Sequence, residues 1–390
     1  MNSLPVRILA AVLTFTLGVG LANFSLTTPH INPVVCRFPV GSRPPQLEMV
    51  FVIDTTGSMG GLLDAAKQRI WGIVNGVIRE HHSSVRIGLV AYRDHGDAYV
   101  TQILPLTEDL DKVYMTLMDY QAAGGGDGPE DVRTALAESL YKIPWSEAGS
   151  SVSRIIFLVG DAPPHDDYTD AADTLTTAAN AAQKGIIVNT IQCGFSGETK
   201  RAWEAIAANG QGQYFAIPAD GGVQAITTPY DEQLSDLAQK LSATILPYGF
   251  GAGAEGEAKR TEVAMKAEAV EARVATSAPS AAKAERAINK AISSDAYIGD
   301  LLQQIENGSV TLETVDQAQL PADLRGMTPY DQRQEIERRL AVRSDLRHQI
   351  LLLWKQRDAF VEAERKKSSN DGFDVVVAKA LQEQMARTIK

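Results

Sequence analysis

One acid and two hydroxyl side chains occupy alternate positions directly after a short apolar run. The run, residues 49–53 (MVFVI), is rich in the β-branched and aromatic residues typical of a buried parallel strand. Asp54, Thr56 and Ser58 follow it. Ligands bind beyond the carboxyl ends of strands in open α/β sheets, and oxygen donors suit a hard cation such as Mg²⁺. This stretch therefore predicts a metal site, although the same residue types also cap helices.

Two later segments favour the metal site over a helix cap. The loop 124–130 (GGGDGPE) places Asp127 among glycines, and the apolar run 155–160 (IIFLVG) ends at Asp161. Three separate loops would thus bring a carboxylate to one edge of one sheet. The predicted metal ligands are Asp54, Thr56, Ser58, Asp127 and Asp161.

The three motifs DTTGSM, GGGDGPEDV and VGDAPPH resemble the metal-ion-dependent adhesion site of von Willebrand factor A-type (VWA) domains. The match is closest to the bacterial and α-kinase-associated branch of that family, and it covers roughly residues 47–246. The resemblance implies a doubly wound, mostly parallel six-stranded sheet of the α/β class. It also implies a non-catalytic protein-binding module that uses Mg²⁺, with Mn²⁺ or Ca²⁺ as alternatives.

The motifs depart from the family pattern at two positions. Thr56 stands where many members have serine, which keeps the hydroxyl donor, and Asp127 stands where many members have threonine. Three carboxylates around one divalent ion would make it less attractive to a carboxylate of a partner. Asp127 could instead act through a water molecule or through hydrogen bonds to the ligands.

Composition limits the partners and the location of the protein. The formal net charge of −11 argues against nucleic acid as a partner, because binding its phosphates needs a basic surface.

The apolar run from Ile8 to Ala22 after Arg7 is short for a membrane span. Residues 1–22 therefore suggest a signal peptide, with an uncleaved membrane anchor as the alternative, and residues 23–46 a linker. We expect an exported protein that is periplasmic, secreted or at the cell surface. Export permits a Cys36–Cys193 disulfide, but Cys193 could equally be a small buried apolar residue.

Strand-like and helix-like patterns alternate from Leu47 onward, which is typical of a doubly wound sheet. The link at 92–97 is too short for a helical crossover, so the second and third strands must be antiparallel and the third lies at an edge. The expected strands are 48–53, 85–91, 98–104, 154–160, 186–192 and 213–217. The expected helices are 61–80, 109–120, 129–142, 169–184, 198–208 and 230–243.

The composition changes after Pro247. Residues 247–294 begin with glycines and continue with Ala, Glu, Lys and Arg, so we expect a flexible linker without a core of its own. Within it, residues 257–293 could be weakly helical or disordered. Residues 295–390 are predicted to form a separate helical unit, which could be a coiled coil. Thr328 and Pro329 predict the start of a helix that runs to about Lys367 and is roughly 55 Å long. Its apolar stripe needs a partner. This partner could be a helix predicted at 297–305, a last helix predicted at about 374–388, or another molecule such as a second copy of the chain.

Two groups of polar residues flank the predicted metal edge. His165, Asp166 and Asp167 could form a rim that selects partners, but the preferred interpretation is a cap for a helix beginning near Tyr168. Residues 93–97 contain an arginine and two aspartates that suggest a turn with local pairing.

Two other function classes compete with the binding module. A strand that ends in Asp54 and a later Gly160-Asp161 pair bear a distant likeness to haloacid dehalogenase-type phosphatases. In those enzymes a second acid stands two residues after the nucleophile, where this chain has Thr56, so the general acid is missing. The third class is an assembly factor that works beside a partner ATPase, which export of the chain argues against.

Overall fold

The computed structural model describes residues 46–390 except 82–83, 127, 148, 150–151, 166, 224–225, 294–295, 298, 368–371 and 389–390. The predicted signal peptide or anchor (1–22), residues 23–45 of the predicted linker, Cys36 and Asp127 thus lie outside the described residues. Within the described part of the chain, no helix is long and apolar enough to cross a membrane.

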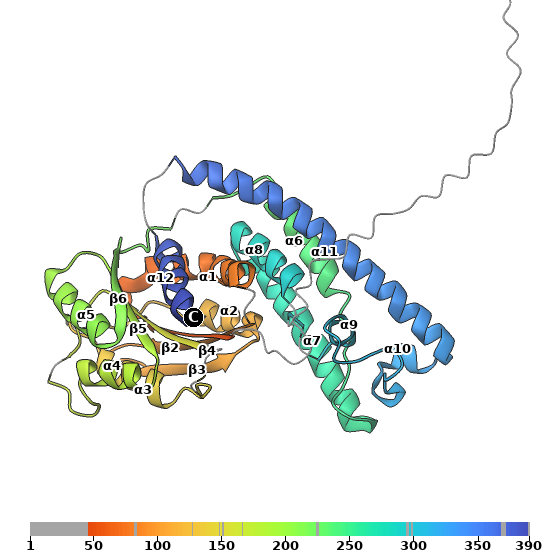
Figure 1. The fold of residues 1–390 in the computed structure, drawn as a ribbon, viewed down its shortest axis with the longest axis horizontal. Helices are drawn as coiled ribbons and strands as arrows, with labels where there is room; N and C mark the ends of the chain where they lie inside the picture. The colour runs from red at the N-terminus through yellow and green to blue at the C-terminus, as the bar shows by residue number, and fades with distance from the viewer. Residues whose placement is uncertain are drawn as a thin grey trace, which may run out of the picture. The chain divides into compact units, whose positions relative to one another are not determined.

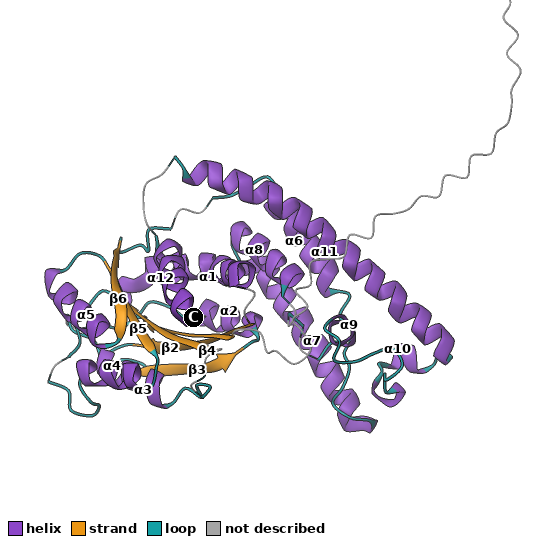
Figure 2. Ribbon diagram, viewed as in Figure 1, coloured by secondary structure: helices purple, strands orange, loops and turns teal. Residues whose placement is uncertain are grey.

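A six-stranded sheet forms the centre of the fold, with helices on both of its faces (Figure 1 and Figure 2). The strand order is β3-β2-β1-β4-β5-β6, and only the β2–β3 pair is antiparallel. The predicted fold class and the antiparallel edge strand are therefore confirmed. The strands are β1 Gln46–Asp54, β2 Ser84–Tyr92, β3 Thr101–Thr107, β4 Val152–Gly160, β5 Ile187–Cys193 and β6 Gln211–Ile217.

The strand order places the metal motifs at one point of the sheet. Strand β1 pairs with β2 on one side and with β4 on the other, so the direction of winding reverses between β1 and β4. In doubly wound sheets, ligands bind in the crevice beyond the carboxyl ends of the strands at such a switch point. Asp54 ends β1 and Asp161 follows β4, so both lie at this point.

Helices cover the two faces of the sheet. On one face, α1 (Gly60–His81) and α2 (Leu110–Asp119) share a core with one set of strand side chains. On the other face lie α3 (Val132–Tyr141), α4 (Thr174–Gln183) and α5 (Gly197–Asn209), which pack around a second core. A 3₁₀ turn, Gly57–Met59, joins β1 to α1. Each predicted helix of this region exists, with α4 beginning five residues later than expected.

The prediction of a flexible linker over 247–294 is wrong. Residues Gly253–Ser277 form helix α7 and Ser280–Ile292 form α8. Helix α8 buries Ala284, Ala287 and Ile288 and packs against α1 and α6 (Asp231–Ser242). Alanine is the best helix former and its small side chain lets helices approach closely. A segment poor in large apolar residues can therefore still pack when a larger neighbour supplies the apolar surface.

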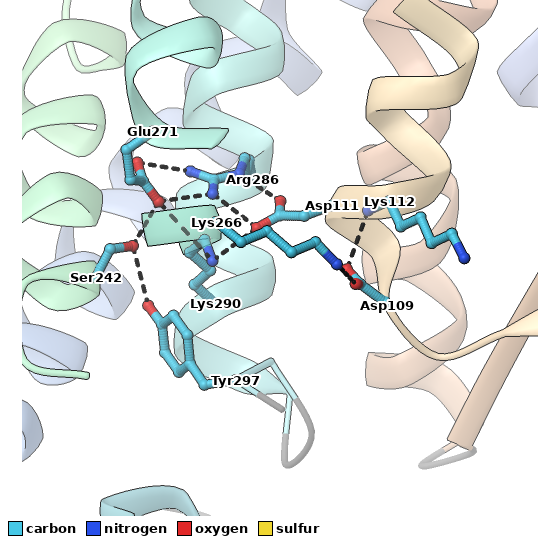
Figure 3. A network of polar contacts seen from close by, with 9 residues as sticks. All are labelled: Asp109, Asp111, Lys112, Ser242, Lys266, Glu271, Arg286, Lys290 and Tyr297. Atoms are coloured by element: carbon cyan, nitrogen blue, oxygen red, sulfur yellow. Dashed lines mark hydrogen bonds and ion pairs between the residues drawn. The ribbon is translucent and has the colours of Figure 1, made fainter. Parts of the chain in front are cut away.

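Buried ion pairs also fix α7 and α8 in place (Figure 3). Arg286 is 2% exposed; its Nε lies 2.7 Å from Asp111 Oδ1 at the start of α2, and its Nη2 lies 2.6 Å from Glu271 Oε1 on α7. Lys290 Nζ lies 3.1 Å from Asp111 Oδ2. Burial opposes ionisation of Asp111, but Arg286 and Lys290 nevertheless lower its pKa. Paired charges thus contribute to the packing of this region, which has few large apolar side chains.

The long helix of the C-terminal region is confirmed. Helix α11 spans Pro329–Arg365, with Thr328 as its N-cap. The apolar side chains of α11 pack within the chain. Leu346 and Ile350 pack with α6 and α8, and Ile336 packs in a small core near α9 (Leu301–Glu306). Short turns lie between α9 and α11, namely a 3₁₀ turn at Gln317–Gln319 and α10 at Ala322–Arg325.

The boundaries predicted at 246 and 295 do not separate two independent cores. The last helix, α12 (Phe373–Thr388), packs on the same sheet face as α1. Its Phe373 ring lies 6.0 Å from the Phe51 ring, which stacks at 5.3 Å on Phe157 (centroid distances). Meanwhile α6 packs with α8 and α11. The end of the chain, rather than α6, covers this part of the sheet.

Candidate metal centre

Asp54 is the last residue of the central strand β1 and is fully buried. Its Oδ1 accepts hydrogen bonds from the backbone N (2.8 Å) and the Oγ1 (2.6 Å) of Thr56. Aspartate commonly bonds the backbone two residues further on in a turn. Its Oδ2 is buried and accepts no hydrogen bond from the residues that the structure describes.

The third predicted loop brings Asp161 to the same edge. A Cβ atom at Gly160 would lie 2.4 Å from the hydroxyl of Tyr92 and 3.2 Å from the Cβ of Asp54, so the close approach of β4 to β1 needs glycine. Helix α5 holds the loop, because Thr199 Oγ1 donates to the Asp161 carbonyl (3.0 Å). Asp161 itself is half-buried.

The second loop is closed by contacts with residues far away in sequence. The backbone N of Gly57 donates to the Gly124 carbonyl (3.2 Å), and the Asp97 carboxylate accepts from the Gly125 N (3.0 Å). Gly124 and Gly125 have positive φ values of 81° and 79°, which other residues rarely adopt. The predicted local pairing is present, because Asp97 also accepts from the Asp94 N (3.3 Å). Asp97 thus supports the second loop in addition to its own turn.

Arg93 likewise acts beyond its own turn. Its Nε donates to the Thr55 carbonyl (3.1 Å) and its Nη2 to the Gln121 carbonyl (2.7 Å). Its guanidinium lies 4.4 Å from the centre of the Tyr99 ring. Arg93 thereby ties the first loop to the segment that leads into the second.

Glu130 is a site residue that the sequence analysis missed. It is 4% exposed, and its Oε2 is buried without a hydrogen bond from any residue in the described part of the chain. A Cβ atom at Gly125 would meet both Glu130 Oε1 (3.4 Å) and Thr56 Cβ (3.5 Å), so the carboxylate lies against the first loop. The signal was present in the GGGDGPE motif, but an acid near a helix start has an ordinary explanation as a cap.

In the absence of a cation, burial and the neighbouring acids disfavour the ionised form of the carboxyl groups of Asp54 and Glu130. Burial, with a further contribution from Asp161, raises the pKa of Asp54 to about 7 despite the hydrogen bonds from Thr56. Burial, with contributions from Asp54, Asp94 and Asp97, raises the pKa of Glu130 to about 8. Two buried carboxylate oxygens without hydrogen bonds, surrounded by further acids, form a donor set that fits a hard divalent cation.

The structure brings together three of the five predicted ligands: Asp54, Thr56 and Asp161. Thr56 is buried, and its hydroxyl is directed to Asp54. Ser58 lies in the 3₁₀ turn with an exposed side chain. Asp127 lies outside the described residues, so its role stays a prediction.

An aromatic stack stands beside this edge. The Tyr168 ring lies between two imidazoles, with centroids 4.1 Å from His95 and 4.1 Å from His165. The Tyr168 hydroxyl donates to Asp94 Oδ1 (2.8 Å). The predicted helix cap at 165–167 is wrong, because α4 begins at Thr174 and its N-cap is Asp173. His165 instead stacks on Tyr168, and its Nδ1 lies 2.9 Å from Asp167 Oδ1.

Comparison with known proteins identifies the family of the sheet domain. The sequence model of the von Willebrand factor A domain family matches residues 48–229. Residues 48–229 therefore belong to the VWA domain family, whose members typically serve as protein-interaction modules and are generally not enzymes.

The similar relatives are much longer proteins. The von Willebrand factor A domain-containing protein 7 of Rattus norvegicus is 30% identical over 195 residues, which is 50% of this chain and 20% of the relative. The protein of the same name from Homo sapiens is 33% identical over 133 residues, which is 34% of this chain and 14% of the relative. The chain thus spans a fifth or less of their length.

Solved structures with a detectable likeness include the SpRpn10 VWA domain, at 16% identity and a TM-score of 0.35 over 45% of this chain and 88% of that one. Another is proximal thread matrix protein 1 from the mussel byssus, at 11% identity and a TM-score of 0.35 over 45% of this chain and 43% of that one.

Proposed function

We propose that this chain is an exported protein that binds a partner protein through a divalent cation, Mg²⁺ above all, and catalyses no reaction. The observation that carries the proposal is the buried Oδ2 of Asp54. It accepts no hydrogen bond from the described residues and lies at the switch point of the sheet, next to Asp161. A bound cation would neutralise these acids and offer a coordination position to an oxygen of the partner.

Asp54, Thr56 and Asp161 are the ligands that the geometry supports, and we assign Ser58 and Asp127 from the family motif. Glu130 adds a further negative charge to the set. A cation surrounded by so many carboxylates attracts a partner's carboxylate less than it attracts a neutral oxygen, such as an amide carbonyl or a hydroxyl. We therefore favour a partner that presents a neutral oxygen, with a basic side chain beside it to meet the half-buried Asp97.

A phosphatase function is not favoured. Thr56 donates its hydroxyl to Asp54 Oδ1 and occupies the position where such an enzyme carries its general acid. Purified protein should therefore release no phosphate from a generic aryl phosphate in the presence of Mg²⁺.

Partner capture tests the proposal directly. The full chain is immobilised and exposed to envelope extract with Mg²⁺, then washed with EDTA. We expect a retained protein that EDTA releases and that Asp54→Ala does not capture. Asp236→Ala, which changes an exposed acid on α6, is the matched control and should capture normally. Capture that persists in EDTA, or in Asp54→Ala, would contradict a cation-mediated interface.

A further inference from the structure

A second group of potential metal ligands lies beside the VWA site and uses none of its predicted ligands. It comprises His95 in the β2–β3 loop, Asp131 at the start of α3 and Asp170 in the β4–α4 loop. His95 Nε2 lies 3.0 Å from Asp131 Oδ2 and 3.2 Å from Asp170 Oδ2. The three atoms all lie within 4.8 Å of one another. Three loops thus converge on one small volume.

Asp131 provides the observation that points to a ligand. It is fully buried, and its Oδ1 accepts the backbone N of Thr134 (2.9 Å) as the N-cap of α3. Its Oδ2 is also buried and accepts no hydrogen bond from any described residue, although it is directed at His95 Nε2. One oxygen therefore fixes the carboxylate on the helix, and the other remains available for an ion. Ligating carboxylates are usually held by a second interaction of this kind.

The imidazole of His95 is positioned before any ion binds. Its ring stacks on Tyr168 at 4.1 Å with an angle of 9° between the planes. Tyr168 is in turn held by the ring of His165 on its other face and by Asp94 at its hydroxyl. This stack limits rotation of the His95 ring and keeps Nε2 directed towards the two carboxylates.

Asp170 closes the group on the solvent side. Its side chain is 50% exposed and that of His95 is 42% exposed, so water can complete the coordination shell. The loop that carries Asp170 is tied to α3, because Arg133 Nη2 donates to the carbonyl of Ala171 (2.8 Å).

We propose that His95, Asp131 and Asp170 form a second metal site, which binds a divalent transition-metal ion of the Zn²⁺ type. Ligand atoms about 2.0–2.2 Å from one ion lie roughly 3.0–3.4 Å apart when they are neighbours in its shell, which matches the His95 distances. A neutral imidazole and two carboxylates balance the charge of the ion. An imidazole nitrogen favours Zn²⁺ over Mg²⁺, which prefers oxygen ligands. The two neighbouring sites would thus differ in the metal they select.

The competing explanation is a protonated His95 that bridges the two acids. It accounts for the same distances without any metal. A single Nε2 proton, however, would be shared between two acceptors, and Asp131 Oδ2 accepts no hydrogen bond within the described part of the chain. A metal ion would bind Asp131 Oδ2 and Asp170 Oδ2 directly, whereas a single Nε2 proton has to be shared between them.

A metal at this position would link the β2–β3 loop, the start of α3 and the β4–α4 loop. The same three segments carry Asp97, Glu130 and Asp161 of the first site. The second ion would therefore stabilise the loops that build the first site, without contacting a partner itself.

Zinc binding to the full chain tests the proposal. The measurements use the Asp54→Ala background, which removes the first site and makes the result independent of the proposed function. We expect calorimetry to show one equivalent of bound Zn²⁺, and Co²⁺ to give the visible absorption of a site with nitrogen and oxygen ligands. Adding His95→Gln or Asp170→Asn should abolish both signals while the circular dichroism spectrum is retained.

His348→Gln is the matched control, because it removes an exposed histidine on α11, and it should leave the bound equivalent unchanged. Zinc binding that survives both His95→Gln and Asp170→Asn would overturn the assignment. The absence of any bound Zn²⁺ in the starting protein would overturn it too.

Discussion

The two oxygens of Asp54 have different environments, and this difference defines the site at the scale of single residues. Oδ1 is satisfied by two donors from Thr56, whereas Oδ2 has no donor among the described residues. Leaving a buried charged oxygen unpaired costs stability. Retaining this arrangement is therefore reasonable only if something that the protein binds meets Oδ2.

The first prediction concerns pH. The pKa values of Asp54 and Glu130 are raised to about 7 and about 8, from ordinary values of 3.8 and 4.5. Between these limits the folded metal-free protein holds more protons than the unfolded chain, so its stability falls as the pH rises from about 5 to 8. Thermal melts in EDTA should show this decline, and saturating Mg²⁺ should reduce it. A metal-free melting temperature that rises over the same pH range would contradict the raised pKa values.

The second prediction separates charge from shape at Glu130. The substitution Glu130→Gln keeps the volume of the side chain but removes one buried negative charge. At pH 8 in EDTA it should raise the melting temperature, because Asp54 and Asp161 then face less repulsion. It should also weaken Mg²⁺ binding in calorimetry. A variant that is less stable in EDTA would show that Glu130 is held by favourable contacts instead.

The sequence was sufficient for those site residues that follow directly from a strand. Asp54, Thr56 and Asp161 lie where strand ends meet, so their approach is a consequence of sheet topology. Glu130 and Asp97 could not be placed in this way, because their positions depend on a loop that closes through contacts between segments about 30 residues apart, such as that of Asp97 with Gly125. Their residue types fit a local turn or cap equally well.

At the scale of elements, α8 and α12 show what hydrophobic periodicity can and cannot predict. The inner strands β1, β2, β4 and β5 were predictable because their buried runs are nearly continuous and rich in β-branched residues. Helix α8 was not, because its buried face consists mostly of alanines and of the paired charges of Arg286 and Lys290. Helix α12 was predicted as a helix, but its place on the sheet depends on contacts with β1 and β4 that no local pattern encodes.

The third prediction tests the role of α12 in the core. Phe373 is 1% exposed and packs against Phe51, so Phe373→Ala should lower the free energy of unfolding by about 3–5 kcal/mol. The control in the same helix is Val375→Ala, which changes a side chain that is 37% exposed and should cost far less. Urea denaturation measures both. Equal effects of the two substitutions would show that α12 is not packed on the sheet.

At the scale of the whole molecule, the residues after 246 complete the fold that begins at 46. Helix α8 packs against α1, α12 covers part of the sheet, and Arg286 links α8 to α2. A domain boundary near 246 would expose these apolar faces. The family match ends at residue 229, yet the packed core extends to α12.

The fourth prediction tests this coupling. Arg286→Ala leaves Asp111 and Glu271 without their main partner and should reduce the free energy of unfolding by about 3–5 kcal/mol. The matched control is Arg273→Ala, which removes an exposed pair with Asp119 and should cost less than about 1 kcal/mol. A single cooperative transition is expected in both variants. Two separate transitions in the unaltered chain would instead indicate that α7 and α8 unfold independently of the sheet.

The most direct test of the central claim is calorimetric titration of the full chain with Mg²⁺. We predict one site whose binding is lost in Asp54→Ala and in Asp161→Ala, with the circular dichroism spectrum retained and with normal binding in the exposed control Asp236→Ala. Mg²⁺ is the appropriate probe because the neighbouring group around His95 carries a nitrogen ligand, which Mg²⁺ disfavours. Unchanged Mg²⁺ binding in both Asp54→Ala and Asp161→Ala would contradict the assignment of the metal site.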